Sequence, residues 1–199
     1  MVSKSTPLRI TPSVSERHPP MLKKIFLTLA VLIIIFLIVV AVQPADYRVV
    51  RSTTIAAPAP VIFAQVNDLH RWDAWSPWAK LDPAMKTTFD GPAAGTGAIY
   101  HWVGNKDVGE GQMTITESHP SDLIKIQLDF IKPFPSSSVT EFMFKPDSVQ
   151  TAVTWSMSGK NNFVAKAFCL FMNMDKMVGG DFEKGLAQLK TVTEGAAKK

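Results

Sequence analysis

The side chains that most often carry catalysis or bind a metal are scarce in this sequence. It holds four histidines and one cysteine, and none of them lies in a metal-ligand spacing such as HExxH or CxxC. His101 lies between Tyr100 and Trp102 in a predicted strand, so it points away from the core if Trp102 points into it. Cys169 has no thiol or histidine near it in the sequence. We therefore predict no metal, no cofactor and no catalytic residues.

Three other patterns resemble catalytic motifs but have a better structural explanation. Ser76, in the segment Trp-Ser-Pro-Trp, lacks the glycines of a GxSxG nucleophile elbow, and Ser-Pro favours a tight bend. The glycines at 95 and 97 precede a predicted strand and have no lysine partner, which indicates a hairpin loop rather than a phosphate loop. Asp107 and Glu110 flank a glycine turn, where carboxylates are usually solvated.

The net charge of +4 is confined to the N-terminal segment. Of the 21 basic and 17 acidic residues, five and one lie in residues 1–43, so 16 of each remain in residues 44–199. A neutral domain lacks the basic surface that nucleic acids require, so we predict no nucleic-acid partner. At 199 residues the chain has room for one domain and an appendage.

Residues 25–42 form an apolar run in which Thr28 is the only polar side chain. As a helix this run spans roughly 27 Å, close to the ~30 Å hydrocarbon core of a bilayer. Cations precede it, among them Lys23 and Lys24, so the positive-inside rule places the N-terminus in the cytoplasm. We predict that residues 21–43 are a signal anchor in the inner (cytoplasmic) membrane, with residues 44–199 on the periplasmic, extracytoplasmic side. A cleaved signal peptide is the alternative, because small residues around Ala41 suit cleavage.

Residues 1–20 are rich in proline, serine and threonine and lack hydrophobic periodicity, so we predict a disordered tail. Met21, followed by Leu-Lys-Lys, would be a natural beginning for a signal anchor. Both Met1 and Met21 therefore stay open as the start of translation.

After residue 44 the hydrophobic pattern changes to the alternation of a β-sheet with one apolar face. The clearest case is residues 123–130, where Ile124, Ile126, Leu128 and Phe130 point one way. A short helix is predicted over residues 61–66, after two prolines that suit a helix start. Strands are predicted over residues 47–55, 99–103, 112–118, 123–130, 139–145 and 151–158.

The last part of the chain has the period of a long helix, with Asn161 or Asn162 as its N-cap. Its apolar stripe consists of Phe171, Met174, Val178, Phe182, Leu186 and Leu189. Gly179 and Gly180 weaken this helix by about 1 kcal/mol each relative to alanine. A curved antiparallel sheet wrapped around the helix buries both apolar faces, so we predict an α+β fold.

Three stretches of the domain carry a family resemblance: residues 55–58 with 71–78, residues 95–102 with 109–111, and residues 177–186. In them the sequence resembles the START/Bet v 1-like (SRPBCC) superfamily, and more narrowly its polyketide cyclase/dehydrase-like branch. The resemblance covers about residues 45–193 and implies the helix-grip fold, with one or two short helices after the first strand. It is specific for the fold and weak for an activity.

The resemblance also implies a hydrophobic cavity between the sheet and the long helix. The predicted apolar faces agree with it, since they are rich in aromatic residues and methionine. The alternative is a solid core, because large apolar side chains are most often simply buried. The residues that we expect to contact a ligand are Trp72, Trp75, Trp78, Trp102, Phe130, Trp155, Met157, Phe168, Phe171 and Met172.

The leading hypothesis for function is therefore a membrane-anchored module that binds a hydrophobic small molecule or lipid. A second hypothesis is a cyclase/dehydrase-like enzyme acting in the same cavity. It requires polar groups that converge inside, from among Tyr100, His101, Glu110, Thr154 and Asp181. A third is a non-catalytic partner or sensor of another membrane protein, for which the span has few of the small residues that pack helices together.

Overall fold

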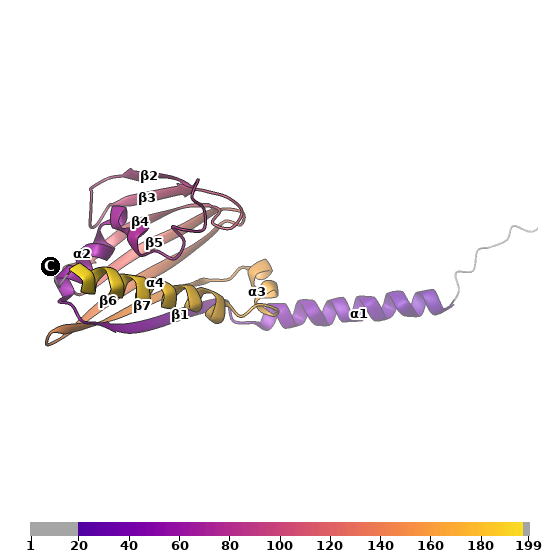
Figure 1. Ribbon diagram of the computed structural model, residues 1–199. Coiled ribbons are helices and arrows are strands. Elements are labelled where there is room, and N and C mark those ends of the chain that lie inside the picture. Colours follow the sequence, from indigo (N-terminus) through magenta and orange to yellow (C-terminus); the bar gives the residue numbers. More distant parts are fainter. Residues whose placement is uncertain (1–19, 197–199) are drawn as a thin grey trace, which may run out of the picture. The chain divides into compact units, whose positions relative to one another are not determined.

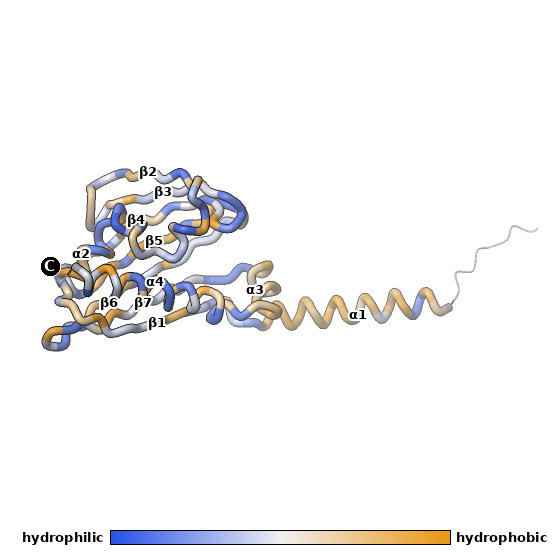
Figure 2. Tube along the Cα trace, viewed as in Figure 1, coloured by the Kyte–Doolittle hydropathy of each residue, from blue (hydrophilic) through white to orange (hydrophobic). Residues whose placement is uncertain are grey.

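The computed structural model of the protein describes residues 20–196, which belong to two compact units, Met1–Val42 and Gln43–Lys199. In the first unit, α1 (Pro20–Val42) is apolar except at its N-terminal end, where Lys23 and Lys24 lie (Figure 2). Among the described residues it is the one helix long and apolar enough to cross a membrane, and an N-terminal signal sequence would share those properties. Apart from Pro20, the predicted tail over residues 1–20 lies outside the described residues.

The second unit is built on a seven-stranded antiparallel sheet (Figure 1). From β2 to β7 each strand pairs with the next in sequence, and β1 pairs with β7, giving the order β1-β7-β6-β5-β4-β3-β2. One open edge is the short strand β2, which begins with Lys86 and ends with Asp90. The strands are β1 (Asp46–Ile55), β2 (Lys86–Asp90), β3 (Ile99–Val103), β4 (Glu110–His119), β5 (Leu123–Lys132), β6 (Ser136–Asp147) and β7 (Gln150–Lys160).

Alternation along the strands gives the sheet its apolar face, as the sequence predicted. In β5, Ile124 and Ile126 are fully buried, and in β7 Val153 and Trp155 are buried to a similar degree. Ser156, on the other face of β7, is also buried, and it accepts a hydrogen bond from the Arg48 guanidinium at 3.3 Å. The long side chain of Arg48 thus covers part of the outer face of the sheet.

Two short helices connect β1 to β2, namely α2 (Ala59–Asn67) and the 3₁₀ helix η1 (Leu69–Ala74). The first turn of α2 contains Pro60. Proline has no backbone N–H, and none is needed there because the N–H groups of a first turn have no acceptor within the helix. The indole N–H groups of Trp72 and Trp75 donate to the carbonyl oxygens of Val66 and Gln65, at 2.9 and 3.2 Å. These bonds satisfy carbonyls at the end of α2, and they fix both tryptophans against the sheet.

The C-terminal segment differs from the prediction, because it forms two helices instead of one. Asn162 caps the short helix α3 (Phe163–Cys169), accepting a hydrogen bond from the backbone N–H of Ala165 at 2.9 Å. A tight turn follows, and Asn173 then accepts from the N–H of Lys176 to begin α4 (Met174–Ala196). The predicted stripe is correct from Met174 onward, whereas Phe171 lies in the turn and is 80% exposed.

Trp155 is the centre of an aromatic cluster between the sheet and α4. Its ring stacks on Phe182 of α4, with the centroids 4.0 Å apart and the planes at 7°. It also stacks on Phe142 of β6, with centroids 4.7 Å apart. Trp72 and Trp75 meet it edge to face. Trp155 is only 1% exposed, so this cluster joins η1, the sheet and α4 in one core.

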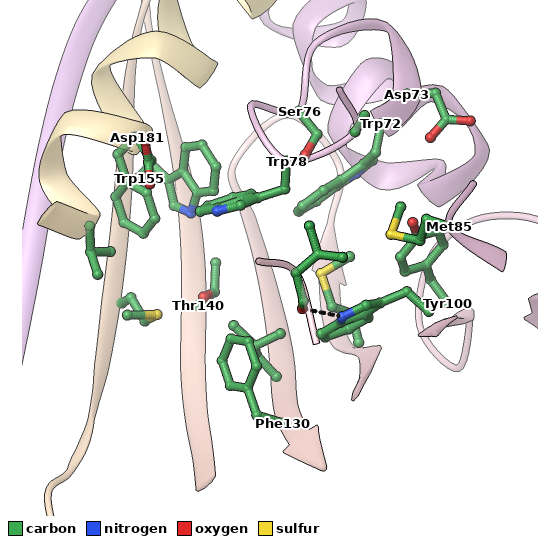
Figure 3. Close-up of a pocket in the computed structure, with 18 of the residues that line it drawn as sticks. Trp72, Asp73, Ser76, Trp78, Met85, Tyr100, Phe130, Thr140, Trp155 and Asp181 are labelled. Atoms are coloured by element: carbon green, nitrogen blue, oxygen red, sulfur yellow. Dashed lines mark hydrogen bonds between the residues drawn. The ribbon is translucent and has the colours of Figure 1, made fainter. Parts of the chain in front are cut away.

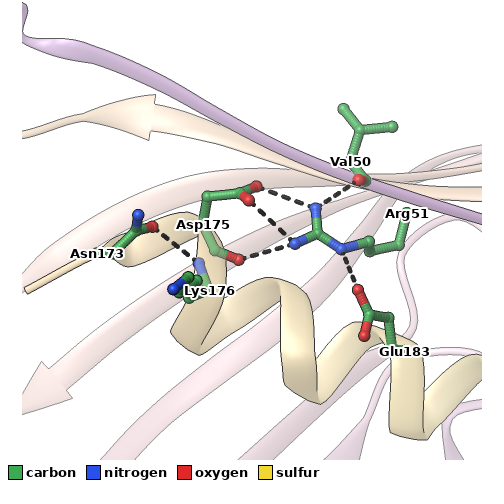
Figure 4. A network of polar contacts seen from close by, with 6 residues as sticks. All are labelled: Val50, Arg51, Asn173, Asp175, Lys176 and Glu183. Carbon is green, nitrogen blue, oxygen red and sulfur yellow. Dashed lines mark hydrogen bonds and ion pairs between the residues drawn. The ribbon is translucent and has the colours of Figure 1, made fainter.

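Arg51 of β1 fixes the first turns of α4 to the edge of the sheet (Figure 4). Its guanidinium donates to both carboxylate oxygens of Asp175, each at 3.0 Å, and to Glu183 at 2.6 Å. The hydrogen bond to Asp175 is the main cause that raises the pKa of Arg51, and the same bond lowers the pKa of Asp175. A Cβ atom at position 179 would overlap the guanidinium, so Gly179 gives Arg51 the room to cross the helix.

The paired glycines of α4 provide a matched test of this crossing. Gly180→Ala is expected to raise the free energy of unfolding by up to about 1 kcal/mol, because nothing lies within 4 Å of the added Cβ. Gly179→Ala is expected to give no such gain, since the added Cβ displaces Arg51. Urea denaturation of the two variants, followed by circular dichroism, measures the difference. Equal stabilisation by both would contradict the close approach of Arg51.

Candidate functional site

A cavity of about 340 Å³ lies between the apolar face of the sheet and α4 (Figure 3). An engineered cavity of about 150 Å³ is enough to bind benzene, so this one has room for a larger molecule. Its walls come from η1 and the loop after it, from strands β3 to β7, and from α4. The residues that line it are Trp72, Asp73, Ser76, Trp78, Ala79, Met85, Tyr100, Trp102, Asp107, Val108, Met113, Leu128, Phe130, Thr140, Trp155, Met157, Met177, Val178, Asp181 and Phe182.

The indole of Trp102 forms part of the wall, and two features of the sequence hold it in place. Its N–H donates to the carbonyl oxygen of Val108 at 3.0 Å, within the loop between β3 and β4. Gly111 lies opposite Trp102 in the register of these strands, and a Cβ there would come within 2.5 Å of the indole ring. The glycine thus lets Trp102 lie over β4, where it meets Phe130 edge to face.

The cavity also contains hydroxyl groups that have no hydrogen-bond partner among the described residues. Thr140 is 5% exposed, and its hydroxyl faces the cavity (Figure 3). Tyr100 is 8% exposed, and burial together with the charge of Asp73 raises its pKa to about 12. The phenol therefore stays protonated at neutral pH, so Tyr100 can both donate and accept a hydrogen bond.

Most of the predicted ligand-contact residues line this cavity: Trp72, Trp78, Trp102, Phe130, Trp155 and Met157. Trp75 does not; it is fully buried behind Trp72 and Trp155. Phe168, Phe171 and Met172, which were also expected to contact a ligand, lie instead on α3 and in the turn after it. They are 54%, 80% and 48% exposed, and none lines the cavity.

Several lining residues were not predicted as ligand contacts. Met113, Leu128 and Thr140 belong to the inner faces of β4, β5 and β6, and alternation from the buried residues of each strand would have indicated them. Val178 and Phe182 were part of the predicted helix stripe. Met85 and Val108 lie in loops, where no periodic pattern places a side chain.

Only some of the polar residues considered for catalysis reach the cavity. Tyr100 and Asp181 line the cavity, whereas His101, Glu110 and Thr154 do not. His101 lies 3.2 Å from Asp90, and Glu110 lies 2.6 Å from Lys132, both away from the cavity. The described residues that line the cavity include no histidine, cysteine, lysine or arginine. What these walls offer a ligand is apolar contact and a few hydrogen bonds.

The fold and this cavity define a helix-grip protein with an apolar pocket. A family model described as "Polyketide cyclase / dehydrase and lipid transport" matches residues 46–194, and the chain belongs to this family. The resemblance noted in the sequence is thus confirmed, and the family suggests a domain that binds a hydrophobic ligand. No curated protein matches the chain.

Similar solved structures support the fold at low sequence identity. A protein of unknown function from Staphylococcus aureus has a TM-score of 0.57 at 13% identity, and the match covers 79% of this chain and 99% of that one. A protein from Rhizobium leguminosarum gives 0.54 at 14%, covering 76% and 97%. StfQ, a di-domain ARO/CYC from the steffimycin biosynthetic pathway, gives 0.56 at 8%, covering 78% of this chain and 53% of its own.

Proposed function

We propose that this protein is a membrane-anchored module that binds a hydrophobic small molecule or lipid between its sheet and α4. The observation that carries the proposal is the cavity of about 340 Å³, which stays open in the middle of an aromatic core. Close packing is the rule inside proteins, and a space of this size is typical of a binding pocket. The description of the family, which includes lipid transport, supports the same function.

The anchor is α1, whose apolar segment Met21–Val42 matches the hydrocarbon thickness of a bilayer. The cations before it favour a cytoplasmic N-terminus and place Gln43–Lys199 on the extracytoplasmic side. In this arrangement the module binds its ligand next to the membrane, where hydrophobic molecules are most concentrated.

The tryptophans of the protein provide a direct test of binding. Four of the five line the cavity, and the fifth is Trp75, directly behind it. We expect ω-bromodecanol to quench the tryptophan fluorescence of the full chain in phosphatidylcholine nanodiscs in a saturable way, because bromine quenches on contact. Quenching that rises linearly with the lipid-dissolved probe, without saturation, would contradict a binding site.

The single native cysteine makes the membrane topology testable as well. Val149, between β6 and β7, is 82% exposed, so a Val149→Cys/Cys169→Ser variant carries one accessible thiol on the domain. We expect a membrane-impermeant maleimide to label this thiol in intact spheroplasts, and the protein to stay in the membrane fraction after carbonate extraction. Labelling that appears only after lysis would reverse the orientation, and a soluble, shortened chain would indicate a cleaved signal peptide.

A further inference from the structure

The charged residues that line the cavity all have the same sign. Among the residues that line it, the charged ones are Asp73, Asp107 and Asp181, and none is basic. Asp181 has a nearby cation, Lys184, at 2.8 Å. Asp73 and Asp107 form no ion pair within the described part of the chain, and both are exposed. Because Asp73 and Asp107 are exposed and also line the cavity, they lie where the cavity meets solvent, and neither has a cation paired with it in the described part of the chain.

The interior of the cavity provides hydrogen-bonding groups without any charge. Ser76, Tyr100 and Thr140 are each less than a tenth exposed, and all three line the cavity. Their hydroxyl oxygens are not among the buried atoms that lack a hydrogen-bond partner, so they are accessible from the cavity and can pair there with a polar group of a ligand. Hydroxyls can pair with a neutral polar group, whereas an anion would leave water and find no cation in exchange.

From these observations, and resting on the proposed function, we infer that the pocket selects an apolar ligand that carries no negative charge. A neutral alcohol or carbonyl group pairs with the hydroxyls. A cationic amine is accepted as well, because carboxylates and aromatic faces are both part of the lining. Amphiphiles with a carboxylate or phosphate group are excluded at two stages, by repulsion at the opening and by the loss of hydration inside.

Three brominated probes with the same alkyl chain test this selection: ω-bromodecanol, ω-bromodecylamine and ω-bromodecanoate. The protein is the full chain in phosphatidylcholine nanodiscs at low salt and neutral pH, with tryptophan quenching corrected for the partition of each probe into lipid. We expect the alcohol and the amine to bind at least tenfold more tightly than the carboxylate. A carboxylate that binds as tightly as the alcohol would overturn the inference and leave hydrophobic binding intact, whereas no saturable quenching by any probe would overturn the proposed function itself.

Asparagine variants locate the origin of the selection. Asp73→Asn/Asp107→Asn/Asp181→Asn is expected to bind ω-bromodecanoate several-fold more tightly than the wild type does, so that the ratio of the affinities for ω-bromodecanol and ω-bromodecanoate falls. Asp46→Asn/Asp122→Asn/Asp147→Asn changes the net charge equally at residues that do not line the cavity, so it should leave all three affinities unchanged. Equal gains in both variants would show that the acidic residues of the pocket have no special role. The order of the probes on the wild type tests the inference even if the first variant misfolds.

Discussion

Replacing Trp155 by alanine is expected to lower the free energy of unfolding by about 3–5 kcal/mol. Trp155 is 1% exposed and stacks on both Phe182 and Phe142. Its removal therefore takes away packing contacts between the sheet and α4. The aromatic contacts add to the loss of buried area, since such pairs contribute about 0.5–1.5 kcal/mol each. Urea denaturation of the full chain in nanodiscs, followed by near-ultraviolet circular dichroism, measures the change.

Two control variants show whether the loss of stability is specific to Trp155 or would follow from removing any aromatic side chain. Phe134→Ala removes a ring that is 68% exposed, so it should change the stability by less than about 0.5 kcal/mol. Trp155→Phe keeps a ring in the stack and removes the indole N–H, which is buried and has no hydrogen-bond partner in the described structure. It should therefore cost much less than alanine. A loss below about 1 kcal/mol for Trp155→Ala would mean that the neighbouring rings close the gap.

Filling the cavity is expected to abolish ligand binding while the fold is kept. Leu128→Trp and Val178→Trp enlarge side chains on opposite walls, one on β5 and one on α4, and together they occupy the space between them. We expect saturable quenching by ω-bromodecanol to disappear, with a cost in stability of about 1–3 kcal/mol for each insertion. Quenching titrations of the double variant measure the loss, and circular dichroism checks that it is folded.

The matched control places the same two substitutions outside the pocket. Val103 and Ile131 are 50% and 46% exposed and do not line the cavity. The Val103→Trp/Ile131→Trp variant should bind like the wild type, although its two added tryptophans will change the total emission. Binding retained by Leu128→Trp/Val178→Trp would place the ligand somewhere other than between β5 and α4.

The strands could be predicted well because their burial follows the alternation of the sequence. Residues 123–130 and 151–158 lie within β5 and β7, and the weaker prediction over 99–103 coincides with β3. The break between α3 and α4 could not be predicted by periodicity, because Phe171 and Met174 have the spacing of one helix face. The turn depends on Asn173, which caps a new helix there, and a second cap so close to Asn162 competes with a continuous helix.

The pocket itself could be predicted only in part. The apolar faces indicated Trp102, Trp155 and Met157, but whether they enclose an open space depends on how closely α4 approaches the sheet. The role of Gly179 likewise depends on Arg51, which is far away in the sequence. The three acidic residues of the lining belong to η1, to the loop between β3 and β4, and to α4. These segments are far apart in the sequence, so their common charge at the cavity could not be predicted before the fold was known.

The short edge strand β2 limits how copies of the domain can pair with each other. An exposed strand edge is a template for pairing with another copy. β2 offers only five residues, with a lysine at one end and an aspartate at the other, so an added strand would gain few hydrogen bonds. We therefore expect pairing between copies through the β2 edge of the sheet to be weak.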